Sequence, residues 1–176
     1  MKMSAPAWIG LCLLVPGLLL GCGKGALLSP GVSSATEGGG EPAPSFELTA
    51  TDGSELSLAA LEGKIVVVDF WATWCQPCAV SFPKYQELAE RYPELVVIGI
   101  NENDESDGIA KFVEETGVSF PIAWDEDKSV AGSFGIETMP TSYIIDRAGL
   151  IRHVHTGFTD GDEADLDRQI RLILEE

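Results

Sequence analysis

The stretch that decides the fold is Ile65–Cys78, IVVVDFWATWCQPC, in which a run of β-branched and aromatic residues leads into two cysteines separated by two residues. The run Ile65–Trp71 is apolar at nearly every position, which is typical of a central strand buried on both faces. After the second cysteine, apolar residues recur at roughly helical spacing, at Phe82, Tyr85, Leu88, Ala89 and Tyr92. We therefore expect the cysteine pair to lie where a buried strand gives way to a helix.

This placement of Cys75 and Cys78 favours thiol–disulfide chemistry. The first turn of a helix has unpaired N–H groups and a positive dipole end, which lower a cysteine pKa from about 8.5 to between about 3.5 and 7.5. We expect Cys75 to be the exposed nucleophile and Cys78, one turn further in, to resolve the mixed disulfide. A zinc site would need about four ligands, and a purely structural disulfide across so short a loop would restrict the unfolded chain little. We expect no metal here.

The rest of the chain alternates strand and helix patterns. Alternating residues around the turn at 51–54 indicate an early β-hairpin, and Gly117 is expected to stop a helix. Strands are expected at 65–71, 95–100, 142–145 and 151–154, and helices over 76–92, 109–116 and 166–174. Pro83 lies inside the first of these helices and is expected to kink it. The order ββ, βαβα, ββα predicts an α/β sandwich with a parallel centre and antiparallel edges.

The N-terminus has the pattern of an export signal. Lys2 precedes the apolar run Ala7–Leu20, which is shorter than the roughly 20 residues of a spanning helix. The run ends in Leu-Leu-Gly-Cys, which resembles the lipobox of bacterial lipoproteins and implies lipid attached to Cys22. An ordinary cleaved signal with a chance cysteine, or an uncleaved anchor, is the alternative. The predicted parts are a signal peptide (1–21), a flexible Gly/Ser/Pro-rich tether (22–44) and a folded domain (45–176).

Charge and cysteine usage narrow the function further. The formal net charge is −17, which argues against nucleic acid as a partner because phosphate binding needs a positive surface. Of the four cysteines, Cys12 lies in the predicted signal peptide and Cys22 would carry lipid. Cys75 and Cys78 are then left for chemistry, on the outer, periplasmic side of a bacterial membrane.

The segment Val68–Cys78 resembles the active-site signature of thioredoxins. The early hairpin, Pro83 and the segment Met139–Ser142 resemble the membrane-anchored TlpA/ResA branch of that family, and the similarity covers about residues 42–176. The resemblance implies a thioredoxin-like three-layer α/β/α sandwich with an added N-terminal β-hairpin. It also implies a thiol–disulfide oxidoreductase of the protein-disulfide reductase type. Such an enzyme acts on disulfides of exported proteins, takes electrons from a membrane donor and needs no cofactor.

Asp69 interrupts the apolar strand six residues before Cys75. A buried carboxylate is unfavourable unless it is paired, and burial raises its pKa. In thioredoxins the matching aspartate helps to move a proton to or from the buried cysteine, so the resemblance implies a proton relay at Asp69. The alternative is an aspartate that points to solvent at a strand end.

Other site residues follow from the resemblance. Pro140 matches the family's cis-proline, and a proline there leaves the backbone of Met139 to pair with an extended substrate strand. Trp74 and Trp71 would flank the site, although core packing is an even alternative for Trp71. Anchored members that reduce apocytochrome c often carry glutamate three positions after the second cysteine. The residue at that position here is Ser81, which weakens an assignment to cytochrome maturation.

Two other functions use related scaffolds. A peroxiredoxin-like peroxidase would need Pro-x₃-Thr-x₂-Cys, but Val68 and Ala72 occupy the Pro and Thr positions. A non-catalytic binding module or a copper chaperone is the other alternative, although such chaperones space their cysteines by three residues and add a histidine. We expect His153 and His155 to have surface roles, since two histidines make a poor metal site.

Overall fold

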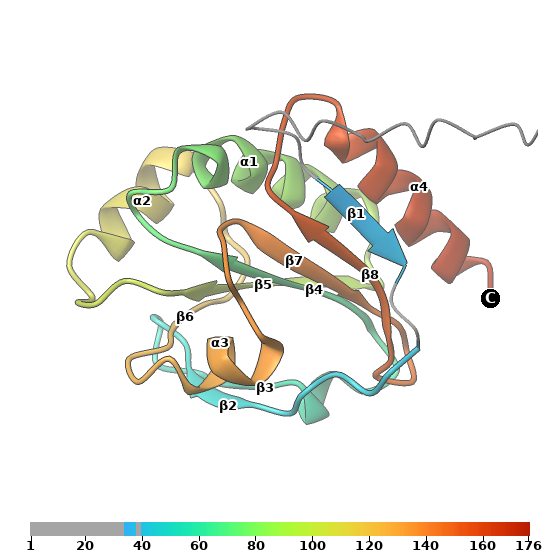
Figure 1. The fold of residues 1–176 in the computed structure, drawn as a ribbon, viewed down its shortest axis with the longest axis horizontal. Helices are drawn as coiled ribbons and strands as arrows, with labels where there is room; N and C mark the ends of the chain where they lie inside the picture. Colours follow the sequence, from blue (N-terminus) through green and yellow to red (C-terminus); the bar gives the residue numbers. More distant parts are fainter. Residues whose placement is uncertain (1–33, 38–39) are drawn as a thin grey trace, which may run out of the picture.

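Strand β4 (Ile65–Trp71) is the centre of the fold, and every one of its residues is buried. The computed structural model describes residues 34–37 and 40–176. In it, six strands form one sheet in the order β1-β8-β7-β4-β5-β6 (Figure 1). The other strands of this sheet are β1 (Ser34–Glu37), β5 (Leu95–Asn101), β6 (Ile122–Trp124), β7 (Thr141–Ile145) and β8 (Ile151–Thr156). β4, β5 and β6 run parallel, whereas β7, β8 and β1 pair antiparallel, which confirms the predicted mixed α/β sheet.

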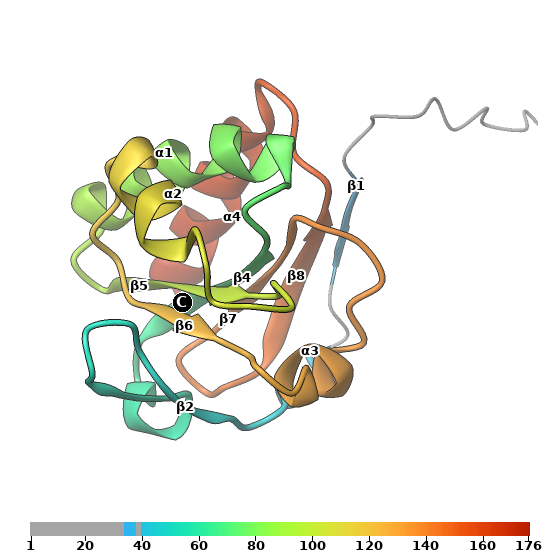
Figure 2. The ribbon, with the colours of Figure 1, turned by 90° about the vertical axis from the view of Figure 1, so that its left-hand side faces the viewer.

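Helices cover both faces of this sheet. One face packs against α1 (Gln76–Arg91), α2 (Ile109–Thr116) and α4 (Asp162–Leu174) (Figures 1 and 2). The other face packs against α3 (Ser129–Phe134) and the hairpin of β2 (Glu47–Thr49) and β3 (Glu55–Ser57), followed by a 3₁₀ turn at Ala59–Leu61. The result is the expected three-layer sandwich with an added hairpin.

The alternation of side chains along β4 explains why the sheet has two apolar faces. Val67 and Trp71 belong to the core under α1, α2 and α4, and Val66, Val68 and Phe70 belong to the core under α3. A strand with apolar residues on both faces can only be stable between two covering layers. The nearly continuous apolar run in the sequence is therefore the direct cause of the three-layer arrangement.

Most predicted elements are present with bounds close to those expected. Gly117 ends α2 in the left-handed conformation (φ 69°), as its position after the helical pattern predicted. The sequence analysis did not predict β6 or α3, which have only three and six residues. None of the helices in the described part of the chain is long and apolar enough to cross a membrane.

The structure differs from expectation within the segment 22–44, which was expected to be a flexible tether. Ser34–Glu37 form β1 and pair with β8. Gly40 and Ala43 then donate backbone hydrogen bonds to Ile151 O and Gly149 O (3.2 and 2.9 Å). The ordered domain thus includes residues before Ser45. The predicted signal peptide (1–21) and Cys22 lie outside the described residues.

Candidate active site

The cysteine pair lies at the start of α1, where the sequence predicted it. Cys75 is the N-cap residue of the helix, and Cys75 and Cys78 form a disulfide with their Cα atoms 5.3 Å apart. The backbone N–H of Cys78 donates to Cys75 Sγ at 3.2 Å. The same N–H group is available to a Cys75 thiolate in the reduced state. A helix N-terminus with an N–H directed at the sulfur stabilises negative charge there.

The burial of the two sulfurs differs less than expected. Cys78 is fully buried, and Cys75 is only 4% exposed. The expectation of an exposed Cys75 is therefore wrong for this disulfide form, because its sulfur is turned toward Cys78 and the helix end. The expected order, with Cys78 the deeper of the two, is confirmed.

The loop before the disulfide is held by an asparagine from the neighbouring strand end. Thr73 N–H donates to Asn103 Oδ1 (3.0 Å), and Asn103 Nδ2 donates to Thr73 Oγ1 (3.0 Å). The N–H of Cys75 donates to Ala72 O (3.0 Å), which closes a turn immediately before the helix. These bonds fix the position of Cys75 relative to the sheet. The sequence analysis missed Asn103, since an asparagine in a loop gives no distinctive pattern.

Trp74 and the Met139–Pro140 segment are among the other residues that the resemblance assigned to the site. Trp74 is 71% exposed, a large value for an indole. The Met139–Pro140 peptide bond is cis, which agrees with the resemblance, and Pro140 is buried. Met139 is partly buried and packs against the core cluster that contains both cysteines. An exposed aromatic ring beside a buried disulfide gives this edge of the domain an apolar contact surface.

Trp71, by contrast, belongs to the core. It is fully buried, and its ring lies 4.8 Å from that of Phe82 and 4.6 Å from that of Phe112 between centroids. These contacts favour the packing interpretation over a flanking role.

Asp69 is fully buried, and the alternative of a solvent-facing aspartate is excluded. It lies on the same face of β4 as Val67 and Trp71, which is the face that packs against α1 and Cys78. Neither carboxylate oxygen has a hydrogen-bond partner among the described residues. Burial raises the pKa of Asp69 well above its ordinary value. Burial therefore favours the protonated, uncharged carboxyl group more than it is favoured in an exposed aspartate.

Tyr85 lies beside this carboxyl group and was missed as a site residue. The Tyr85 hydroxyl donates a hydrogen bond to Ser142 Oγ (3.1 Å). It also lies near enough to Asp69 to oppose part of the rise that burial causes in the Asp69 pKa. Burial, followed by the charge of Asp69, raises the pKa of Tyr85 well above its ordinary value. Tyr85 follows Cys78 by seven residues, so the two share one face of α1. A buried tyrosine needs a partner for its hydroxyl, and this was the signal available in the sequence.

A second pair of acidic residues lies at the ends of β5 and β6. Burial, then the nearby Asp125, raises the pKa of Glu102 to about 7, while Lys128 opposes the shift. Asp125 is fully buried, and its Oδ2 accepts from the N–H of Ala131 in α3 (2.8 Å). This bond satisfies a backbone N–H in the first turn of α3. Glu102 gave no pattern in the sequence.

One of the two histidines differs from the prediction. His155 is 4% exposed, so a surface role is wrong for it, and its Nε2 lies 2.6 Å from Gln169 Oε1. Burial lowers the pKa of His155, which favours the neutral ring. No cluster of three or more potential metal ligands occurs within residues 34–37 and 40–176. A cleft of about 770 Å³ opens between β2, α2 and the start of α3, but neither cysteine lines it.

A mixed sheet with a Cys-x-x-Cys pair at a helix N-terminus, together with a cis-proline before β7, defines the class of thioredoxin-like thiol–disulfide oxidoreductases. The comparisons agree with this class. The sequence model of the AhpC/TSA family matches residues 39–154. The thiol-disulfide oxidoreductase ResA of Halalkalibacterium halodurans is 38% identical over 120 residues, which cover 67% of this chain and 68% of the relative. ResA of Bacillus thuringiensis is 34% identical over 114 residues, covering 64% and 66%.

A solved structure of similar fold leads to the same class. The thiol:disulfide interchange protein of the thioredoxin family from Chlorobium tepidum has a TM-score of 0.68 and 28% identity, and the match covers 80% of this chain and 99% of that one. The chain belongs to the AhpC/TSA family, and within it resembles the ResA oxidoreductases. The matches to these curated relatives span about two thirds of their length.

Proposed function

We propose that this protein reduces disulfides of exported proteins, with Cys75 as the attacking group. The observation that carries the proposal is the position of Cys75 as N-cap of α1, with the N–H of Cys78 directed at its sulfur. A thiolate at that place is stabilised without losing access to a client through the exposed edge beside Trp74. Cys78, deeper in the helix, has no comparable route to a client.

The reaction proceeds by two exchanges. The Cys75 thiolate attacks one sulfur of a client disulfide, so that a mixed disulfide forms and one client thiolate leaves. Cys78 then loses its proton and attacks Cys75 Sγ, which releases the second client thiolate and forms the Cys75–Cys78 disulfide. The client gains two electrons and two protons, and the enzyme dithiol supplies the electrons.

Asp69 supports the second exchange in this proposal. Cys78 is buried, so its proton cannot pass directly to bulk water. Asp69 lies on the strand face under α1, and its raised pKa makes it a better proton acceptor than an ordinary, exposed aspartate. Tyr85 tunes the pKa of this carboxyl group, while Asp69 moves the proton.

Client binding is assigned to Trp74, Met139 and Pro140. The exposed ring of Trp74 offers apolar contact, and the backbone of Met139 can pair with an extended client segment.

Export and anchoring complete the proposal. The chain carries a signal peptide (1–21), and Cys22 becomes lipid-modified and holds the domain at the periplasmic side of the membrane. The short apolar run that ends in Leu-Leu-Gly-Cys supports this. Mass spectrometry of the mature N-terminus should find an acylated Cys22. An unmodified N-terminus at another residue would overturn the anchoring.

The direction of electron flow is tested by the reduction potential of the Cys75–Cys78 couple. The reductant thioredoxin has a reduction potential of about −270 mV, and the oxidant DsbA has one of about −120 mV. If this protein is a reductant, its potential should be nearer to the first value. Equilibration with dithiothreitol buffers, followed by alkylation and mass analysis, measures it. A value near the oxidant end would contradict the proposed direction while leaving the exchange chemistry intact.

A peroxidase on the same scaffold is not favoured. Val68 and Ala72, which occupy the positions where a peroxidase would need proline and threonine, are fully buried and apolar. They leave no polar group there to bind a peroxide oxygen.

A further inference from the structure

The strand β1 lies along the outer edge of the sheet beside β8, and its direction sets where the N-terminal segment enters the domain (Figure 1). The pairing is antiparallel, with Ser34 opposite Thr156 and Glu37 opposite His153. The chain therefore enters β1 at the end of β8 that Thr156 occupies and runs toward the other end.

That entry point is the active-site end of the sheet. Thr156 pairs with Thr141, which follows Pro140, and Thr141 pairs with Phe70 near the end of β4. Gly157 N–H also donates to Pro140 O (2.8 Å). Ser34 thus lies in the same row across the sheet as the residues that lead into the cysteine loop. Three strand spacings separate β1 from β4, which is about 14 Å.

The next contacts along the chain lie at the opposite end. Ile151 N–H donates to Glu41 O (2.8 Å), and Pro42 forms an isolated bridge with Leu150. Without β1, the first fixed contact of the chain would be beside Ile151. Pairing of β1 moves the entry point along the whole of β8, from Ile151 to Thr156, a shift of about 17 Å toward the cysteines.

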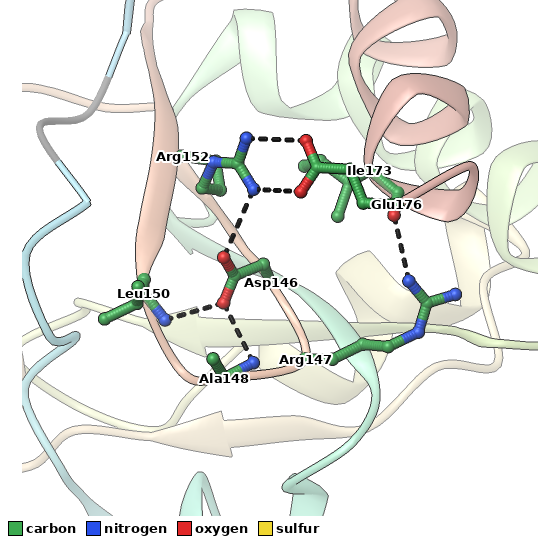
Figure 3. A network of polar contacts seen from close by, with 7 residues as sticks. All are labelled: Asp146, Arg147, Ala148, Leu150, Arg152, Ile173 and Glu176. Carbon is green, nitrogen blue, oxygen red and sulfur yellow. Dashed lines mark hydrogen bonds and ion pairs between the residues drawn. The ribbon is translucent and has the colours of Figure 1, made fainter.

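The C-terminus is held at that same remote end. Arg152, near the start of β8, makes two hydrogen bonds with the carboxylate of Glu176 (2.6 and 2.8 Å) and one with Asp146 Oδ2 (3.3 Å) (Figure 3). Arg147 donates to Ile173 O (2.9 Å). The chain therefore enters the folded part at one end of the sheet, beside the cysteine pair, and its C-terminus lies at the other end.

We propose that β1 directs the N-terminal anchor so that the Cys75–Cys78 edge faces the bilayer, within reach of a dithiol partner held in the membrane. This rests on the proposed anchoring through Cys22. The chain from Cys22 to Ser34 advances 12 residues and spans at most about 40 Å. The partner's dithiol becomes a disulfide as the Cys75–Cys78 disulfide becomes a dithiol, with two electrons and two protons transferred.

The test attaches the protein to a membrane chemically, so that it does not depend on natural lipidation. Every described element lies at or after Ser34, so a protein that begins at Cys22 keeps the described fold. With Cys75–Cys78 oxidised, the Cys22 thiol is coupled to a maleimide lipid in phosphatidylcholine vesicles. Uncharged vesicles are chosen because the chain is strongly acidic. After the unreacted maleimide has been quenched, a phosphatidylethanolamine-linked dihydrolipoyl group is added to the vesicles as the membrane dithiol.

Two variants serve as comparisons. In the first, Cys22→Ser is combined with a copy of residues 23–33 and a terminal cysteine after Glu176, so that a tether of equal length leaves from the remote end. In the second, Ala35→Pro/Thr36→Pro breaks β1, since alternate residues direct their N–H toward β8 and one of the two must be lost. Reduction by soluble dithiothreitol is measured for all three, which shows whether the dithiol itself is intact.

For each protein, the rate of reduction by the vesicle-borne dithiol is divided by the rate of reduction by dithiothreitol. We expect this ratio to be at least tenfold larger for the natively attached protein than for the C-terminally attached one. The double-proline variant should lose most of this advantage. Equal relative rates for the two attachments would overturn the proposed orientation, and an unchanged rate in the double-proline variant would overturn the role of β1. Neither result bears on whether Cys22 is lipidated in the cell, which the N-terminal mass measurement decides.

Discussion

The Tyr85 hydroxyl donates a hydrogen bond to Ser142 Oγ (3.1 Å), and Ser142 lies directly opposite Asp69 in the β4–β7 ladder. Helix α1 contributes two buried residues to this layer, Cys78 near its start and Tyr85 two turns later. The sheet contributes Asp69, which lies on the face of β4 that packs against α1 and is fully buried. The redox pair and a titratable group thus occupy the same buried layer.

Replacing Asp69 with asparagine should stabilise the protein at neutral pH. The folded-state pKa of Asp69 is raised, so the folded state binds this proton more tightly than the unfolded state does. The contribution of Asp69 to the free energy of unfolding is therefore largest below the unfolded-state pKa of about 3.9. It falls as the pH rises toward the pKa of the folded state. Asp69→Asn should remove that fall and be more stable at pH 7 by about 1–4 kcal/mol. Urea unfolding of both proteins at pH 5 and 7 measures it.

The same variant should exchange disulfides more slowly. Without a carboxyl group to accept the Cys78 proton, we expect the rate near pH 7 to fall by about tenfold or more. Equal rates for the two proteins from pH 5 to 9 would contradict a proton-transfer role for Asp69, and the stability gain alone would then indicate only a buried acid.

Tyr85→Phe should shift the pH profile of exchange upward. The hydroxyl lowers the Asp69 pKa in part, so its removal should raise that pKa further and move the pH of half-maximal rate in the same direction. The control is Tyr92→Phe at the other end of α1, whose hydroxyl donates to Asp167 (2.7 Å). Each variant should lose about 1 kcal/mol of stability, but only Tyr85→Phe should move the profile. A shift of the same size in both would argue against tuning by Tyr85.

Glu102→Gln should flatten the pH dependence of stability near neutrality. The Glu102 pKa is raised from 4.5 to about 7, so its contribution to stability falls as pH rises through this window and is level above it. After allowance for the solvent exposure of the group, the effect should be about 1–2 kcal/mol. Thermal unfolding between pH 4.5 and 8 measures it, with Glu114→Gln on the exposed surface of α2 as the control. An unchanged slope in Glu102→Gln would show that the group titrates normally.

Gly99→Ala should destabilise the sheet beside Asp69. Gly99 pairs with Asp69 in register, and an added Cβ would lie 2.6 Å from Ile122 Cδ1 and 3.1 Å from Trp71 Nε1. Such overpacking costs about 1–3 kcal/mol. Gly132→Ala in α3 is the matched control, since its Cβ would meet nothing within 4 Å. Urea unfolding should show a loss for the first variant alone, and a similar loss in both would mean that the space near Trp71 is not limiting.

The sequence was sufficient for the elements that have strong periodicity. The strand Ile65–Trp71, the helix at the cysteines and the C-terminal helix follow from continuous apolar or helical patterns. β6 and α3 were missed because three and six residues are too few to establish a period. β1 was missed because Ser34–Glu37 lie among glycines and serines, and only its partner β8 makes it a strand.

The residues of the candidate site also fall into those with a local sequence signal and those without one. Cys75, Cys78, Asp69 and Pro140 belong to a local motif or interrupt a local pattern, so the sequence could single them out as candidates. Tyr85, Asn103 and Glu102 act through neighbours that are distant in sequence, such as Ser142 and Asp125. Their roles depend on which strands lie side by side, and a single sequence does not give that information. The burial of Cys75 also depends on the three-dimensional packing of the helix end.

The most direct test of the account is to trap the first exchange. Cys78→Ser should leave stable disulfide adducts between Cys75 and client proteins, recoverable from cells without reductant, because the resolving thiol is absent. Cys75→Ser should give few or none, since Cys78 is fully buried. Adducts are counted by non-reducing electrophoresis and identified by mass spectrometry. Adducts formed by Cys75→Ser alone, or a reduced Cys75 that resists alkylation at pH 7, would contradict the assignment of Cys75 as the nucleophile.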